Sequence, residues 1–387
     1  MLIALNKLSA LRVLRSLRRE GRSLETAPRV PLPAPDPSPR KRWTRGLVSL
    51  SWLPRDQPPS EHNPLYVAAP SAGTRLRAPW ACCTTYASGL PDASFLKVEE
   101  GICLPCPELL FVELATIMST PVHALVGYEL CGTFSRDPVD PRLGPVTLGV
   151  PSVTSVERIR RFLGACGSIK GADAAAQTLD CVADDAWSPM EAICAALFAL
   201  PPHELGYDLG HVALNQRHEN AADLVALGCH KSRVPDIELV DTRLGFNYDG
   251  RGHLDLASIV DASDAEDAQI AGMVVRDKYV DDLRRNRELA AQGRLVLPVT
   301  SEDLFAEGGL DAVALEAAAA LEAFDGRRRQ STRNAIASAP LSGLRQRLVW
   351  SLLPWAPGRE AARQHRQWEE RPFVPGTVIE EEIAFWP

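Results

Sequence analysis

The sequence predicts an α/β protein whose second half forms a mixed sheet flanked by helices, preceded by a smaller α+β accessory module. Between residues 188 and 300, stretches of helical periodicity alternate with short apolar runs, which is typical of strands alternating with helices. Residues 46–105 mix short apolar runs with proline and glycine, which indicates strands joined by loops. A chain of 387 residues is long enough for two or three domains.

The first 45 residues are predicted to be a basic amphipathic helix followed by a proline-rich linker. Leucines recur at helical spacing through residues 2–22, with arginines between them. Six prolines from Pro28 to Pro39 indicate a stiff, extended linker. Such a helix is suited to lie on DNA, on a membrane surface or on a partner protein, and it can also pack on the domain that follows, which is the interpretation we favour.

Residues 46–185 are predicted to form the accessory module. Its first helix, over residues 107–127, begins with Pro107, and proline is favoured in the first turn of a helix. Two further helices are expected over residues 154–166 and 170–183.

Residues 186–310 are predicted to form the main α/β domain, and residues 311–387 an alanine- and arginine-rich helical extension. The domain contains a helix, two strands, a long helix and a buried strand, expected over residues 188–200, 237–240, 244–248, 262–292 and 294–300. An alanine-rich helix over residues 301–325 leads into the extension.

The net charge of −7 is unevenly spread along the chain. Residues 1–45 hold eleven lysines and arginines against three acidic residues, and residues 327–371 hold ten arginines against three acidic residues. The rest of the chain is therefore strongly acidic. Basic ends on an acidic body suit a protein that holds a metal centrally and contacts phosphates peripherally, and equally an acidic domain flanked by basic helices.

The cysteines and the lack of a long apolar run bear on where the protein acts. Only Cys103 and Cys106 form a C-x-x-C motif, and no second pair follows at zinc-ligand spacing, so we expect mostly buried thiols in a reducing compartment. No run reaches the roughly 18 apolar residues of a membrane span, and the first ten residues do not resemble a signal peptide. We expect a cytoplasmic protein without a membrane partner.

Acidic residues beside the predicted strands suggest a metal site. Asp236 follows Pro235 and opens one strand, and Asp249 closes the next. Two adjacent strands can bring these residues to one end of a sheet, and a helix packed on the sheet can bring Glu191 beside them. Carboxylates are ligands suited to Mg²⁺ or Mn²⁺, which metal-dependent phosphodiester hydrolysis requires. His253 can take the proton of the attacking water near neutral pH.

The order of these residues resembles the very-short-patch-repair endonuclease-like domains of the restriction-endonuclease superfamily, named for its P-D…(D/E)-x-K motif. The matching segments are Glu191, Pro235-Asp236, Asp249-Gly250-x-x-His253 and Asp282-x-x-Arg285-x-x-x-Leu289-x-x-x-Gly293. Upstream, residues 106–115 and 127–133 are similar to an accessory module of actinobacterial proteins that carry the same nuclease-like domain. The resemblance covers about residues 60–310.

The resemblance implies a role for each matched residue. It implies that Asp236 is the central metal-binding carboxylate and that Asp249 and His253 form the polar pair after the second strand. Glu191 would be the carboxylate supplied by the helix. The implied activity is metal-dependent hydrolysis of DNA, in defence or repair.

Further residues support the implied site. The resemblance implies that Asp282 and Arg285 brace it from the long helix, and that Gly250 supports it after Asp249. The chain departs from the pattern at Asn247, where relatives usually carry glutamate, and it lacks the usual lysine of the motif. An amide is a neutral and poorer magnesium ligand than a carboxylate. The very-short-patch-repair branch itself lacks a carboxylate at that position.

Each feature also has a purely structural explanation. Ser188 and Glu191 fit a capping box at the start of a helix, and Asp249-Gly250 fits a turn between strands. The Asp–Arg pair on the long helix fits a solvated ion pair, and the histidine fits an ordinary surface residue.

Three functions follow from these observations. The first is a magnesium-dependent nuclease acting on DNA. The second is a non-catalytic nucleic-acid-binding regulator, or an antitoxin-like partner, that kept the fold after losing a ligand. The third is an accessory protein of a defence or mobile-element locus that binds a protein partner through its N- or C-terminal helices. Asn247 favours the second, and the joint presence of Asp236, Asp249 and His253 favours the first, which we adopt.

Overall fold

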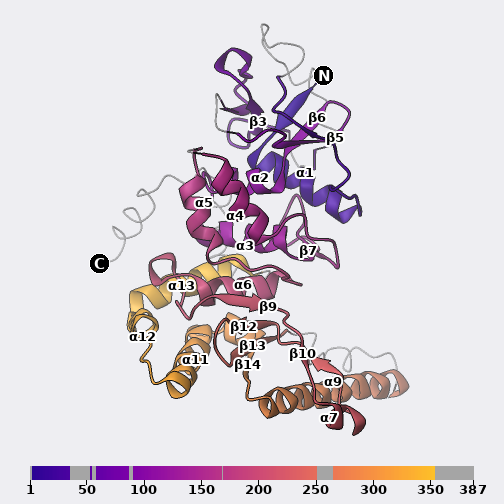
Figure 1. Ribbon diagram of the computed structural model, residues 1–387, viewed down its shortest axis with the longest axis vertical. Coiled ribbons are helices and arrows are strands. Elements are labelled where there is room, and N and C mark those ends of the chain that lie inside the picture. Colours follow the sequence, from indigo (N-terminus) through magenta and orange to yellow (C-terminus); the bar gives the residue numbers. More distant parts are fainter. Residues whose placement is uncertain are drawn as a thin grey trace. The chain divides into compact units, whose positions relative to one another are not determined.

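The structure is a computed structural model that describes residues 2–34, 53–54, 58–86, 90–167, 169–250 and 265–353 (Figure 1). The chain divides into two compact units at Pro189. Residues up to Pro189 belong to unit 1, and the described residues from Met190 onward belong to unit 2. The predicted class, a mixed sheet combined with helices, is confirmed.

A six-stranded sheet forms the core of unit 1, in the order β2-β5-β6-β1-β3-β4. Its strands are β1 (Ile3–Leu5), β2 (Arg29–Val30), β3 (Leu65–Ala69), β4 (Ala81–Thr85), β5 (Phe95–Glu99) and β6 (Ile102–Pro105). β1 pairs parallel with β6 and antiparallel with β3. Because β1 lies inside this sheet, the start of the chain is an integral part of unit 1 and not the separate segment that the sequence suggested.

Helix α1 (Lys7–Arg19) follows β1 directly and packs on unit 1. Its leucines Leu11 and Leu14 are buried. Its arginines are bound within the unit: Arg15 pairs with Glu129 at 2.7 Å, and Arg18 donates to three backbone carbonyl groups. Of the roles open to this helix, packing on its own domain is the one that these contacts support.

The other helices described in unit 1 are α2 (Pro107–Leu114), α3 (Thr120–Cys131), α4 (Val156–Ala165) and α5 (Ala172–Leu179). A short strand pair, β7 (Phe134–Ser135) and β8 (Thr147–Leu148), lies between α3 and α4, and a 3-10 turn at Ala72–Thr74 lies between β3 and β4. The single helix predicted over residues 107–127 is divided into α2 and α3. Ser119 is extended, and Pro121 in the first turn of α3 lacks the N–H that a continuous helix would use.

A four-stranded mixed sheet forms the core of unit 2, in the order β14-β13-β12-β9. Its strands are β9 (Val212–Leu214), β12 (Ile237–Leu239), β13 (Leu244–Asp249) and β14 (Leu295–Thr300). β13 and β14 are parallel, whereas β12 runs antiparallel to both of its neighbours. Helix α6 (Pro189–Ala199) precedes β9, and α9 (Ala265–Ala291) precedes β14.

The two faces of this sheet differ in chemistry because side chains alternate along each strand. Phe246 of β13 stacks on Phe198 of α6, with ring centroids 4.2 Å apart, so one face is apolar. On the other face, Asn247 contacts Asn286 of α9. The polar face is therefore the one that meets the long helix.

A short strand pair fastens to the second half of α9. It consists of β10 (His218–Glu219) and β11 (Ser232–Arg233), and helix α7 (Ala222–Ala226) lies between these two strands in the chain. A one-turn 3-10 helix at Pro202–Glu204 precedes β9 of the four-stranded sheet. Arg233 pairs with both Asp281 and Glu288 of α9. The pair with Glu288 is shielded from water, whereas Asp281 is half-exposed, and together the two pairs fix β10 and β11 against α9.

The described part of the predicted helical extension, up to residue 353, is packed into unit 2. After β14 the chain forms α10 (Ser301–Phe305), α11 (Gly309–Asp325), α12 (Gln330–Ala337) and α13 (Ala339–Leu352). Arg345 of α13, only 1% exposed, pairs with Asp311 of α11 at 2.6 Å and lies over the ring of Tyr207. The alanine-rich helix expected over residues 301–325 is interrupted because Gly308 takes a left-handed conformation.

The described residues bear on two expectations, the lack of a membrane-spanning helix and the burial of the Cys103–Cys106 pair. Within them, no helix is both long and apolar enough to cross a membrane. Cys103 and Cys106 are buried in unit 1, and burial raises the pKa of the Cys106 thiol to about 12. The pair therefore has the environment expected of structural thiols.

Candidate functional site

The direction of the strands in unit 2 determines where the predicted site residues Asp236, Asn247 and Asp249 lie. β9 ends at Leu214, β12 begins at Ile237, and these two residues face each other in the register. Ile237 also faces Phe246 of β13, which ends at Asp249. Because β12 is antiparallel to both neighbours, its start lies at the same end of the sheet as the ends of β9 and β13.

Asp236 is held at this end by three hydrogen bonds. Its carboxylate oxygen Oδ2 accepts from the backbone N–H of Tyr248 at 2.7 Å. Its own backbone N–H donates to Oδ1 of Asn247 at 3.2 Å, and its carbonyl accepts from the N–H of Asn215 at 3.1 Å. The carboxylate thus has a defined orientation. Its second oxygen, Oδ1, takes part in none of these three bonds.

Glu191 reaches the same region from the first turn of α6. It is 8% exposed, and its Oε2 accepts a hydrogen bond from the side chain of Asn215 at 3.2 Å. Asn215 therefore links Glu191 to Asp236, because its backbone bonds one residue and its side chain the other. A position in the first turn is also what the capping-box explanation requires.

The environment raises the pKa of Asp236 to about 7. Burial is the largest cause, and the negative charge of Glu191 is the next. The N–H of Tyr248 and the cation Arg285 act in the opposite direction, and Asp249 adds a smaller increase. The carboxylates of Glu191 and Asp249 are therefore close enough to Asp236 for their negative charge to raise its pKa.

Asp249 is tied to the long helix. Nη2 of Arg285 lies 3.5 Å from Oδ1 of Asp249 and 3.1 Å from Oδ1 of Asp282. The arginine thus bridges the end of β13 and α9, and the helical pair does not simply face solvent. Gly250 follows, and a Cβ there would come within 2.9 Å of the Tyr248 ring, so the position favours glycine.

Asn247 has a structural role that the sequence did not reveal. It is 1% exposed, its oxygen accepts from the N–H of Asp236, and its Nδ2 lies 3.5 Å from Oδ1 of Asn286. The amide holds β12 against β13 and faces α9. Its side chain is therefore engaged with protein groups on both of its polar atoms.

Magnesium is compatible with the donor atoms at this site. Among the described residues, no three His, Cys, Asp or Glu side chains come together closely enough to hold a metal ion. Magnesium, however, is commonly bound by one or two carboxylates and several waters. Glu191 and Asp236 supply such a pair, and a cation would relieve the repulsion between them. His253 lies outside the described residues.

Several residues at the site were missed by sequence reasoning. Asn215 follows a strand of only three residues, β9, which had no recognisable pattern. Cys194 lies fully buried in α6, and burial together with the charges of Asp236 and Glu191 raises the pKa of its thiol. The one sequence signal that could have identified this cysteine is its position about one helical turn after Glu191.

Comparisons with known proteins add no relative to these observations. The chain was compared with protein-family models, with curated proteins and with solved structures, and no significant match was found in any of the three.

Proposed function

We propose that unit 2 is a magnesium-dependent nuclease domain of the restriction-endonuclease type that hydrolyses phosphodiester bonds in DNA. The observation that carries the proposal is the approach of Glu191, Asp236 and Asp249, from three separate elements, to one end of a mixed sheet. The motif resemblance assigned these same residues to the metal site. Manganese is expected to replace magnesium, because both prefer carboxylate and water ligands.

Each residue has a distinct task in this proposal. Glu191 and Asp236 would hold the cation, which would neutralise phosphate charge and make a bound water more acidic. The Tyr248 N–H orients Asp236, and Asn215 positions Glu191. Arg285 holds Asp249 at the edge of the site. His253, four residues after Asp249, is the proposed proton acceptor.

Cleavage assays with defined variants test this proposal. Supercoiled plasmid and single-stranded DNA are incubated with the full-length protein in Mg²⁺, in Mn²⁺ or in EDTA. We expect cleavage with either metal, none in EDTA, and at least a hundredfold loss in Asp236→Asn, on the order of the effect of removing a key catalytic group. Asp223→Asn, on the exposed surface of α7, is the matched control and should retain activity. Metal-independent cleavage, or full activity in Asp236→Asn, would rule out this site.

A second candidate is a nuclease-fold protein that binds nucleic acid without cutting it. It is favoured by Asn247, whose neutral amide occupies the position of the usual glutamate and is hydrogen-bonded to protein groups. If this second function is correct, the protein would bind DNA equally well in EDTA and in Mg²⁺ and would cleave neither supercoiled plasmid nor single-stranded DNA. A gel-shift titration run beside the cleavage assay distinguishes the two functions.

A further inference from the structure

The two edges of the unit 1 sheet differ in how they are protected from further pairing. At one edge, β2 has only two residues and lies between Pro28 and Pro31, which have no N–H to donate. At the other edge, β4 is five residues long and contains neither a proline nor a charged side chain. Within the described residues β4 pairs only with β3, so its outer side is open to another strand.

The outer side of β4 presents backbone groups that the sheet does not use. The N–H of Leu65 in β3 donates to the carbonyl of Trp80, just before β4, and the N–H of Tyr86, just after β4, donates back to β3. Alternate residues from Trp80 to Tyr86 therefore face β3, and the residues between them point their N–H and C=O groups outward. Cys83 and Thr85 thus offer donors and acceptors to an added strand.

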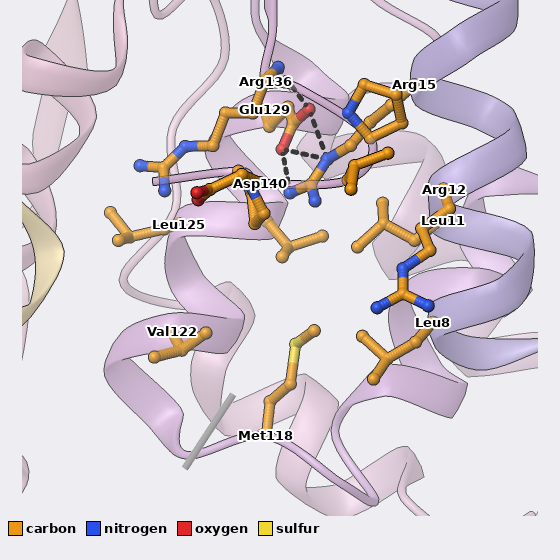
Figure 2. Close-up of a pocket in the computed structure, with 14 residues that line it drawn as sticks. Leu8, Leu11, Arg12, Arg15, Met118, Val122, Leu125, Glu129, Arg136 and Asp140 are labelled. Carbon is orange, nitrogen blue, oxygen red and sulfur yellow. Dashed lines mark hydrogen bonds and ion pairs between the residues drawn. The ribbon is translucent and has the colours of Figure 1, made fainter. Parts of the chain in front are cut away.

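Two arginines beside this edge have no ion pair or hydrogen bond in the part of the chain that the structure describes. Other arginines of unit 1 pair with carboxylates, as Figure 2 shows for Arg15 and Glu129. Arg75 and Arg77 are exposed and have no such carboxylate. Their charge is therefore available to an acidic partner.

The position of these arginines ties them to β4. Arg75 and Arg77 line an open hollow together with Ala81, the first residue of the strand. Burial raises the pKa of the Cys83 thiol and the charge of Arg75 acts in the opposite direction, so this arginine lies close to β4. Leu76 between them is buried, so both arginines point outward, about 6.6 Å apart along an extended backbone. A strand added to β4 would meet two positive charges at that spacing.

The C-terminal segment has the sequence of a strand that matches this edge. Residues 377–385, Thr-Val-Ile-Glu-Glu-Glu-Ile-Ala-Phe, lie outside the described part of the chain, follow Gly376 directly and are rich in residues that favour strands. Glu380 and Glu382 are two positions apart, so in a strand they share one face at the same spacing as the arginines. The 24 positions between Leu353 and the start of this segment span up to about 80 Å, about twice the diameter of a folded unit of this length.

We propose that residues 377–385 pair with the open side of β4 as an added strand of the unit 1 sheet, with Glu380 and Glu382 beside Arg75 and Arg77. The backbone hydrogen bonds supply the affinity. The charge pairs fix the register, because a shift by one residue turns both glutamates to the opposite face. The C-terminal segment thereby covers an edge that would otherwise pair with strands of other chains.

Hydrogen–deuterium exchange of the full-length protein tests this pairing. In the unchanged protein we expect slow exchange of the backbone amides in residues 83–85 and 378–384. Arg75→Glu combined with Arg77→Glu brings like charges together across the two strands. This variant should speed exchange in both segments about tenfold, on the scale of reversing two cross-strand charge pairs.

Two further variants show whether the charges act directly on each other. Adding Glu380→Arg and Glu382→Arg to the glutamate variant exchanges the charges of both partners and should restore slow exchange. Arg327→Glu combined with Arg328→Glu is the control, because it makes the same change in net charge in the exposed turn between α11 and α12. This control should leave exchange in both segments unchanged.

Several results would overturn the proposal. Fast exchange of residues 378–384 in the unchanged protein would show that the segment is not a strand of the sheet. Slow exchange that is unaffected by the arginine variant, or that is not restored by the charge exchange, would place the segment elsewhere. Slow exchange that increases with protein concentration would mean that a second copy, and not the same chain, covers the edge.

Discussion

The side-chain oxygen of Asn247 accepts a hydrogen bond from the backbone N–H of Asp236, with 3.2 Å between the nitrogen and the oxygen. This contact joins the residue proposed as the central metal ligand to the one position where the chain departs from the nuclease pattern. It gives asparagine a local function that glutamate, with a longer side chain, would have to rearrange to perform. We therefore expect the effect of replacing Asn247 to depend on whether a cation is present.

Substitution of Asn247 by glutamate is expected to make stability depend on magnesium. The new charge would lie at a position only 1% exposed, beside Asp236, so the free energy of unfolding should fall by about 3 kcal/mol in EDTA. Mg²⁺ should restore part of this loss and raise any cleavage. Urea denaturation with and without Mg²⁺ measures the effect. Asn247→Gln, equal in size but neutral, is the control, and an equal response of both variants to Mg²⁺ would argue against a metal beside this residue.

The raised pKa of Asp236 predicts a defined pH dependence. In EDTA the folded protein keeps a proton that the unfolded chain loses between pH 3.8 and about 7, so this residue's contribution to stability declines as pH rises through that window. Magnesium must displace the same proton, so its affinity should increase with pH up to about 7 and then level off. Thermal unfolding at several pH values checks both trends, and Asp236→Asn should remove them. A magnesium effect of equal size at pH 5.5 and pH 8 contradicts the assignment.

Breaking the buried pair of Arg15 and Glu129 is expected to destabilise unit 1 strongly. Burial alone would raise the pKa of Glu129, yet the charge and hydrogen bonds of Arg15 lower it below its ordinary value. Arg15→Gln should therefore cost about 3–5 kcal/mol, because it leaves a buried charge without its partner. Arg22→Gln removes a half-exposed pair and should cost less than about 1 kcal/mol. Similar costs for the two variants in urea denaturation would mean that α1 is not a core element.

The helices after β14 are expected to stabilise unit 2 through Arg345. This residue is 1% exposed, pairs with Asp311, and donates through Nε to the carbonyl of Leu205. Arg345→Gln should lower the free energy of unfolding by about 3–5 kcal/mol, whereas Arg327→Gln on the exposed surface should change it little. Limited proteolysis gives an independent measurement, since loosening of α13 should expose cleavage sites within it. Unchanged protection would indicate a separable extension.

The sequence alone determined the elements that have a strong repeating pattern. The strands β13 and β14 and the helices α6 and α9 lie close to their predicted ranges. Long runs of alternating or helical hydrophobicity are local properties, so they can be recognised without knowing the fold. The same patterns placed Glu191, Asp236 and Asp249 beside the ends of neighbouring elements.

The tertiary structure decided the position of elements too short to have such a pattern. β1 has three residues, and its apolar sequence runs directly into the periodicity of α1, so the pattern predicts one helix over both. Only its pairing with β6 and β3 makes it a strand inside the unit 1 sheet. The arginines of α1 likewise suggested a basic surface until their partners, contributed by residues more than 100 positions later, were in place.

The details of the candidate site also depend on distant contacts. Asn215 meets Glu191 and Asp236 because β9 pairs with β12, and Asn286 meets Asn247 because the second half of α9 packs beside β13 and β14. A hydrogen bond between residues far apart in the chain depends on the geometry of both elements, whereas sequence pattern reports on one element at a time. The residue types at the site are therefore readable from the sequence, but their bonding partners are set by the packing of helices on the sheet.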